Sequence, residues 1–143
     1  MVGGLYGLVN GVSGGATSKY LLFVLSAFLD VCVGTVFFAP LRLQIREGKF
    51  REPDLMAARD ASDPRLQNAY WLGADLVVEV VSEDNAQRDT VDKRADYAEG
   101  AISEYWIVNP LDETITVLRL EDEQYTEHGI FKRGDKATSA LLE

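Results

Sequence analysis

The segment from residue 75 to residue 109 constrains the fold more than any other part of the sequence. It begins with the apolar run DLVVEVV, continues into a helical pattern over about 86–99 that Gly100 ends, and closes with the run ISEYWIVNP at 102–110. Because strand, helix and strand follow one another closely, the two strands are expected to be parallel, with the helix on one face of their sheet. This crossover predicts a mixed α/β protein.

Hairpins are predicted on both sides of the crossover. Short turns join alternating or apolar runs before and after it, and a polar connection at 59–73 leads into the strand at 75–82. The last three predicted strands form a β-meander. The sheet is therefore expected to be part parallel and part antiparallel. The strands predicted outside the crossover are about 33–44, 50–58, 114–120 and 125–131.

One stretch, at residues 20–41, is apolar and long enough to cross a bilayer. Asp30 lies near its middle and Gly34 interrupts it, so we interpret it as a buried helix at about 18–31 followed by a strand. We expect no membrane span and a cytoplasmic location, with which the single Cys32 agrees. A membrane-anchored protein is the weaker alternative, which cell fractionation would test.

The charge of the chain limits its partners. The sequence has 143 residues, which fits a single domain, and 47% of them are hydrophobic, which is enough for a core. Its formal net charge is −9, with 23 acidic and 14 basic side chains. Such a surface repels phosphate backbones, so binding to nucleic acid requires a local basic patch, divalent cations or a partner.

Glu79 is the most unusual residue of the crossover, because strand alternation places it between Val77 and Val81 on one face. A buried carboxylate costs free energy unless a cation or hydrogen bonds stabilise it. A second acid, Asp54, follows Pro53, a residue that belongs at a strand start or a sheet edge. Two carboxylates on neighbouring strands can bind a hard divalent ion such as Mg²⁺. The alternative is a solvated Asp54 and a Glu79 that forms a salt bridge.

The helix at 86–99 has two candidate inner faces. The apolar one would be the core face, which leaves Lys93 paired with Asp89 in solvent. Tyr97, however, shares the face of Lys93, which indicates that this side is also covered, and Lys93 could then reach the strand at 75–82. The residues of the apolar face are Val91, Ala95 and Ala98.

The sequence EPDL at 52–55, followed by ADLVVEVVSEDNAQRDTVDKRADYAEGAISEYWIVNP at 74–110, resembles the Uma-two family of restriction-endonuclease-like proteins. That family is placed in the PD-(D/E)XK nuclease superfamily. The resemblance covers about 36–125. It implies a restriction-endonuclease-like core, a mixed sheet flanked by helices, in which Asp54 and Glu79 are catalytic acids that bind Mg²⁺ or Mn²⁺.

The usual catalytic lysine of the superfamily stands two residues after the second acid, and here that residue is Val81. The resemblance implies that Lys93, on the next helix, takes over as the displaced catalytic lysine. It also implies that three neighbours support the site, namely Gln87, Asp89 and Tyr97. Glu52 is a third acid that could contribute, or it is a surface residue.

We therefore expect one nuclease-like domain over 1–143, an endonuclease that hydrolyses phosphodiester bonds in DNA. The glycine-rich start and the end at Glu143 differ from the fuller strands of the family. A nuclease-like domain that lacks terminal strands is therefore kept as an alternative. Exposed sheet edges favour a homodimer. The alternative function is a catalytically inactive binding or assembly module on the same fold, which the net charge of −9 and the missing lysine favour.

Overall fold

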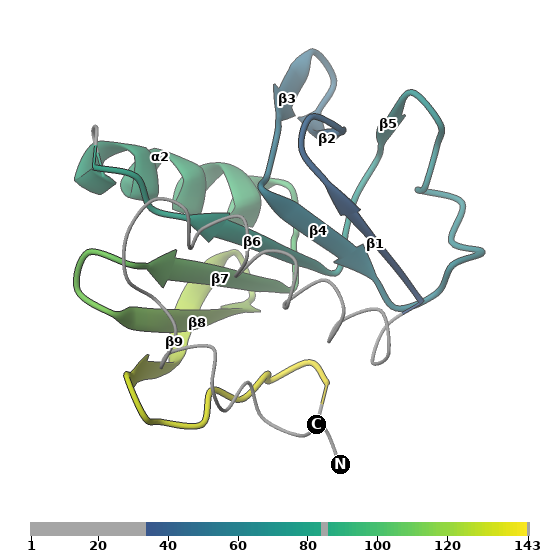
Figure 1. Cartoon of the computed structure of the whole chain (residues 1–143). Coiled ribbons are helices and arrows are strands. Elements are labelled where there is room, and N and C mark those ends of the chain that lie inside the picture. Colours follow the sequence, from purple (N-terminus) through teal and green to yellow (C-terminus); the bar gives the residue numbers. More distant parts are fainter. Residues whose placement is uncertain (1–33, 84–85, 143) are drawn as a thin grey trace.

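The predicted crossover is present in the computed structural model, which describes residues 34–83 and 86–142. Strand β6 (Leu76–Val80) leads into helix α2 (Ala86–Glu99) and then into β7 (Glu104–Asn109), which is parallel to β6. The helix lies on one face of the sheet (Figure 1). The predicted helix at 18–31 lies outside the described residues. Within those ranges, no helix is long and apolar enough to cross a membrane.

The strands form two sheets. A six-stranded sheet has the order β1-β4-β6-β7-β8-β9, and all its neighbours are antiparallel except β6 and β7. A three-stranded sheet has the order β3-β2-β5. The meander β7-β8-β9 is as predicted. The remaining strands are β1 (Thr35–Phe38), β2 (Arg42–Arg46), β3 (Lys49–Arg51), β4 (Leu55–Ala58), β5 (Tyr70–Trp71), β8 (Thr114–Glu121) and β9 (Gln124–Lys132).

Two predicted strands are each divided in the structure, and both divisions fall at a proline. The prediction of one strand at 33–44 was wrong, because a turn at Ala39–Pro40 separates β1 from β2. Likewise Pro53 separates β3 from β4 within 50–58. Proline has no N–H to donate to a neighbouring strand, which ends regular pairing on that side. Each division sends the chain from one sheet into the other.

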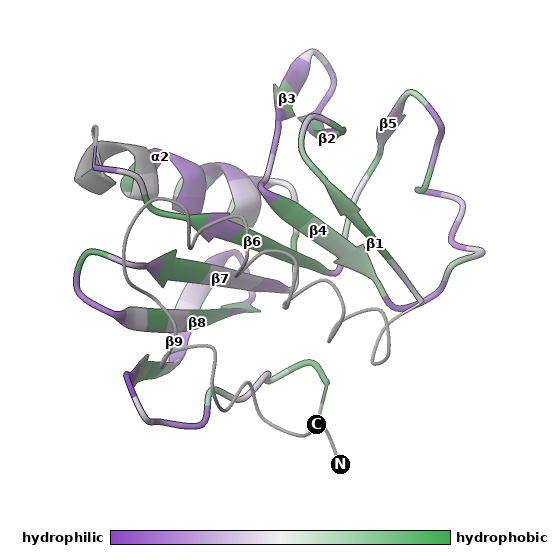
Figure 2. Ribbon diagram, in the orientation of Figure 1, coloured by the Kyte–Doolittle hydropathy of each residue, from purple (hydrophilic) through white to green (hydrophobic). Residues whose placement is uncertain are grey.

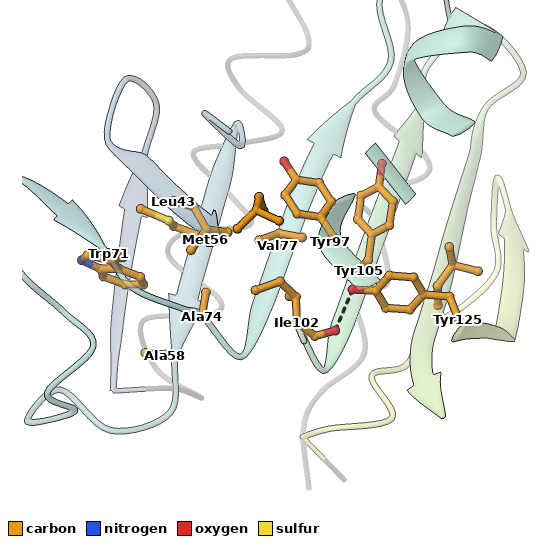
Figure 3. Packing of buried hydrophobic residues seen from close by; sticks show 12 residues of the cluster. Leu43, Met56, Ala58, Trp71, Ala74, Val77, Tyr97, Ile102, Tyr105 and Tyr125 are labelled. Atoms are coloured by element: carbon orange, nitrogen blue, oxygen red, sulfur yellow. Dashed lines mark hydrogen bonds between the residues drawn. The ribbon is translucent and has the colours of Figure 1, made fainter. Parts of the chain in front are cut away.

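Each face of the six-stranded sheet has its own apolar core, since alternate side chains of a strand point to opposite faces. Hydropathy follows this arrangement, with hydrophobic strands beside a largely hydrophilic helix α2 (Figure 2). The core on the α2 side includes three tyrosines in edge or tilted ring contacts, one of which donates through its hydroxyl to the Ile102 carbonyl oxygen at 2.6 Å (Figure 3). These tyrosines are Tyr97, Tyr105 and Tyr125.

Of the two candidate inner faces of α2, the buried one carries Lys93 and Tyr97. The apolar face was wrongly favoured as the core face, and of its residues only Ala98 packs against the core. Val91 is 66% exposed, whereas Tyr97 is fully buried. The small apolar side chains offer little area to bury, while a tyrosine buries a large ring and supplies a hydroxyl group. The sheet beneath α2 carries Glu79, so the helix turns its polar and aromatic face inward to meet that carboxylate.

Ion pairs attach the C-terminal half of α2 to the hairpin of β2 and β3. Asp96, which is 9% exposed, accepts hydrogen bonds from Arg51 at 2.7 Å and pairs with Lys49 at 2.5 Å. Burial alone would raise the pKa of Asp96, but the bonds from Lys49 and Arg51 hold it below its usual value. Because Arg51 lies three residues before Asp54, this pairing also restrains the segment that carries the first predicted acid.

Replacing Asp96 with alanine is expected to destabilise the protein by about 1–3 kcal/mol, since it leaves two partly buried cations without their shared carboxylate. Chemical denaturation would measure the change. Glu121→Ala is the matched control, because Glu121 forms an ion pair with Arg119 in which both side chains are about half exposed, and such pairs contribute little. Equal effects of the two substitutions would contradict a structural role for Asp96.

Candidate active site

Glu79 is a buried carboxylate near the C-terminal end of β6. It is 5% exposed and shares the α2 face of the sheet with Val77. Both of its oxygens accept hydrogen bonds from α2: Oε2 from the Lys93 ammonium at 3.0 Å, and Oε1 from the Tyr97 hydroxyl. The free-energy cost of burying this carboxylate is thus offset by a cation and a hydroxyl donor.

Helix periodicity explains why one carboxylate meets both donors. Lys93 and Tyr97 are four residues apart, so they lie one above the other on the same face of α2. The lysine side chain is 20% exposed, and the tyrosine is fully buried. The alternative in which Lys93 pairs with Asp89 in solvent is therefore replaced by an ion pair with Glu79. The side chain of Asp89 lies outside the described part of the helix.

Asp54 lies directly before strand β4, which is the neighbour of β6, and falls beside Glu79. Strand β4 pairs with β6 in a register that places Leu55 opposite Val78, so Asp54 falls opposite Glu79. Its Oδ2 accepts a hydrogen bond from the backbone N–H of Val80 at 2.7 Å. The break at Pro53 frees Asp54 from regular pairing, and the Val80 N–H then fixes where its carboxylate lies.

Burial is the main reason why the pKa of Glu79 rises from an ordinary 4.5 to about 7. The positive charge of Lys93 and the Tyr97 hydrogen bond oppose this rise, and the negative charge of Asp54 adds to it. The pKa of the Tyr97 hydroxyl is also raised far above its usual value, first by burial and then by the charge of Glu79. Tyr97 therefore remains a hydrogen-bond donor at every physiological pH.

The donor set fits a hard divalent ion that keeps most of its waters. Mg²⁺ binds proteins through one or two carboxylates, and Asp54 and Glu79 supply two from adjacent strands. Within residues 34–83 and 86–142 no group of three or more His, Cys, Asp or Glu side chains is arranged to hold a metal.

A small cavity lies between β6 and α2, beside Glu79 and Lys93. The cavity has a volume of about 10 Å³, at the lower limit for one water molecule. Glu79, Val81 and Lys93 all line it. Val81, two residues after Glu79, and Lys93 of the helix therefore face the same space.

Three further predicted residues, Glu52, Gln87 and Asp89, form no described contact with the two acids. Glu52 is exposed, and none of the hydrogen bonds described above involves it. Gln87 and Asp89 belong to the first turns of α2, but their side chains lie outside the described part of the structure. Their support of the site stays a prediction.

Two contributions to the site were not predicted. The backbone N–H that holds Asp54 belongs to Val80, and a backbone donor leaves no signal in the residue type. The pairing of Arg51 with Asp96 joins the segment before Asp54 to α2. The sequence signals this ion pair only through Asp96, an acid directly before Tyr97. That signal has meaning only when the Tyr97 face of the helix is the buried one.

Comparisons with known proteins identify the family and the fold. A family model, Uma2, described as "Putative restriction endonuclease", matches residues 8–143. A solved structure from Anabaena variabilis, described as a putative nuclease belonging to DUF820, superposes with a TM-score of 0.62 at 18% sequence identity. The match covers 84% of this chain and 69% of that one, and at this identity it shows the fold alone. No curated protein matches the chain.

The free energy of unfolding without divalent ions is expected to fall as pH rises from about 5 to 7. Over this range the folded protein binds the Glu79 proton more strongly than the unfolded chain does, because burial makes the folded pKa the higher one. The contribution is about 1.4 kcal/mol per pH unit for one proton. Denaturant unfolding of wild type and Glu79→Gln at several pH values would show a shallower slope in the variant. Parallel curves would contradict the raised pKa.

Proposed function

Because the chain belongs to the Uma2 family, described as "Putative restriction endonuclease", we propose that it is a metal-dependent endonuclease that hydrolyses phosphodiester bonds in DNA. The observation that carries the proposal is the pair of acids on adjacent strands, Asp54 and Glu79, with Lys93 bonded to the buried one. A purely structural ion pair would not need a second carboxylate held beside it. The geometry is that of a site with two acids and one cation.

Asp54 and Glu79 would hold Mg²⁺ or Mn²⁺ at the edge formed by the end of β6 and the start of β4. When bound, such an ion lowers the pKa of a water molecule and stabilises charge on a phosphoryl group. The Val80 N–H keeps the Asp54 carboxylate in place. Tyr97 holds the other carboxylate by donating to Oε1, which leaves the remaining lone pairs of Glu79 for a cation.

Lys93 has a second task in this proposal. Without a metal it neutralises Glu79, to which it donates at 3.0 Å. Once a divalent ion neutralises the two acids, the ammonium can bond to a phosphate oxygen or to the attacking water, and it stabilises negative charge that develops there. Its partial exposure, 20% of the side chain, gives it access to a substrate.

The divalent ion also explains how a chain with a net charge of −9 can bind DNA. Two carboxylates at the reacting centre would repel a phosphodiester. A divalent ion would neutralise them and leave the positive charge of Lys93 for the phosphate. We include a homodimer in the proposal, because β1 and β9 are the outer strands of the six-stranded sheet in the part of the chain that the structure describes. Unpaired outer strands are available for pairing with a second copy.

A binding or assembly module without catalysis is the second candidate. One observation favours it: Lys93 and Tyr97 already satisfy both oxygens of Glu79, so the buried carboxylate is stable without a metal. The replacement of the usual strand lysine by Val81 points the same way. Metal binding separates the two candidates, because a scaffold has no use for an ion at this position.

Calorimetry with Mn²⁺ is expected to show one saturable site that is weakened at least about tenfold by Asp54→Asn or Glu79→Gln, since each removes an ionised ligand. The affinity should rise with pH through about 7, because binding displaces the Glu79 proton. Glu52→Gln is the control, since it removes a neighbouring exposed acid. No heat with wild type, or equal weakening by Glu52→Gln, would favour the scaffold.

Cleavage of DNA in the presence of Mg²⁺ or Mn²⁺ is expected to fall about 10²–10³-fold in Lys93→Met, while Mn²⁺ affinity stays within a few-fold of wild type. The methionine keeps the length and apolar stem of the side chain but removes its charge. Single-turnover kinetics with a labelled oligonucleotide would measure the loss. Full activity of Lys93→Met would show that the helix lysine is structural.

A further inference from the structure

A groove of about 430 Å³ begins beside the Glu79–Lys93 cavity and follows the α2 face of the sheet. Its size is in the range of small-molecule sites. Three residues, Val81, Thr90 and Ile107, line both the groove and the cavity, so the two spaces are direct neighbours. The other residues that line the groove are Val91, Asn109, Asp112, Thr114 and Thr116.

The strand register makes this groove an extension of the acid site. Glu79 pairs with Ile107 on β7, and Ile107 pairs with Thr116 on β8. These three side chains form one cross-strand row, which starts at the buried acid and leads away from it. A second row lies beside it, where Asn109 pairs with Thr114. The first turns of α2 form the opposite wall, through Thr90 and Val91.

The lining has neutral polar groups and short apolar side chains. None of the described residues that line it is a lysine or arginine, and its one charged member is Asp112. A phosphate group would therefore be unfavourable here, while a base or sugar would not. The Leu111 N–H donates a hydrogen bond to Asn109 Oδ1 at 3.0 Å. This bond fixes the orientation of the side-chain amide, so its NH₂ group is the part that can donate to a ligand.

We propose that this groove binds the base and sugar of one unpaired nucleotide next to the scissile phosphate, so that the enzyme prefers DNA with an unpaired base at that position. The inference rests on the proposed nuclease function and adds its substrate class. The phosphate lies at Lys93, and the attached nucleoside extends along the row from Ile107 to Thr116. A base inside a duplex could not enter, because its edges and faces are already paired and stacked.

The contacts available match such a ligand. Val81, Val91 and Ile107 offer an apolar surface for the flat face of a base, and Val91 is exposed enough to meet it. The hydroxyl of Thr116 and the NH₂ group of Asn109 can bond to a base edge. The same contacts explain why an apolar valine stands at the edge of this groove with 66% of it exposed, while neither core cluster of the described residues includes it.

The test compares two DNA substrates of the same sequence, one fully paired and one with a single unpaired nucleotide beside the cleavage position, by kcat/KM in Mn²⁺. Wild type is expected to cleave the unpaired substrate about tenfold more efficiently, since only an unpaired base can enter the groove and make these contacts. Thr116→Leu, which removes a hydroxyl and fills the groove, should reduce that preference about fivefold or more, mainly through KM.

Controls separate the inference from the proposed function. Thr126→Leu changes a half-buried threonine of β9 that does not line the groove and should keep the preference. Mn²⁺ affinity should be the same in Thr116→Leu and wild type. Equal cleavage of both substrates by wild type, or an unchanged preference in Thr116→Leu, would overturn the groove assignment alone. Cleavage of neither substrate by wild type would overturn the nuclease function and the assignment with it.

Discussion

The burial of the Glu79 carboxylate is the constraint on which the rest of the structure depends. A strand of leucines and valines places this acid on the α2 face of the sheet, where its charge is costly. Only a nearby cation and a hydroxyl donor offset that cost, and α2 supplies both in a single helical turn. The acid therefore decides which face of α2 turns inward, and it ties the helix to the sheet next to the place where chemistry is proposed.

A second set of contacts positions the other acid relative to this pair. Pro53 ends regular strand pairing just before Asp54, and the Val80 N–H then binds the released carboxylate. The ion pairs of Arg51 with Asp96 attach the preceding strand to α2. The same helix thus positions both acids. It holds Glu79 by direct hydrogen bonds, and it restrains Asp54 through Arg51, three residues earlier in the chain. Such rigid support is what a two-carboxylate metal site requires.

The sequence predicted the parts of this arrangement that rest on local patterns. The crossover from β6 through α2 to β7 follows from two apolar runs around a helical segment, and Glu79 was recognisable because it interrupts one of them. For the inner face of α2, the count of small apolar residues favoured the face of Val91, whereas the buried face is the alternative one with Lys93 and Tyr97. A tyrosine and a lysine that meet a buried acid satisfy both their apolar and their polar parts, which no apolar stripe reveals.

Long-range partners explain the other differences. The divisions at Pro40 and Pro53 place consecutive strands in different sheets. The residues around these prolines do not indicate to which sheet the next strand belongs. The groove of Ile107, Asn109 and Thr116 exists only once β7 and β8 are in register. The residue pattern alone left two interpretations of Asp54 and Glu79, and the resemblance to a nuclease family favoured a shared metal-binding role. The register of β4 and β6 places the two acids opposite each other.

Anomalous diffraction from crystals grown with Mn²⁺ tests the central claim most directly, because it locates the ion without reference to activity. The account predicts one strong peak bonded to carboxylate oxygens of both Asp54 and Glu79, at roughly 2.0–2.3 Å, with Lys93 within reach of a water on the ion. A structure with saturating Mn²⁺ and no peak at these acids, in which Glu79 keeps its bonds to Lys93 and Tyr97 alone, would contradict it.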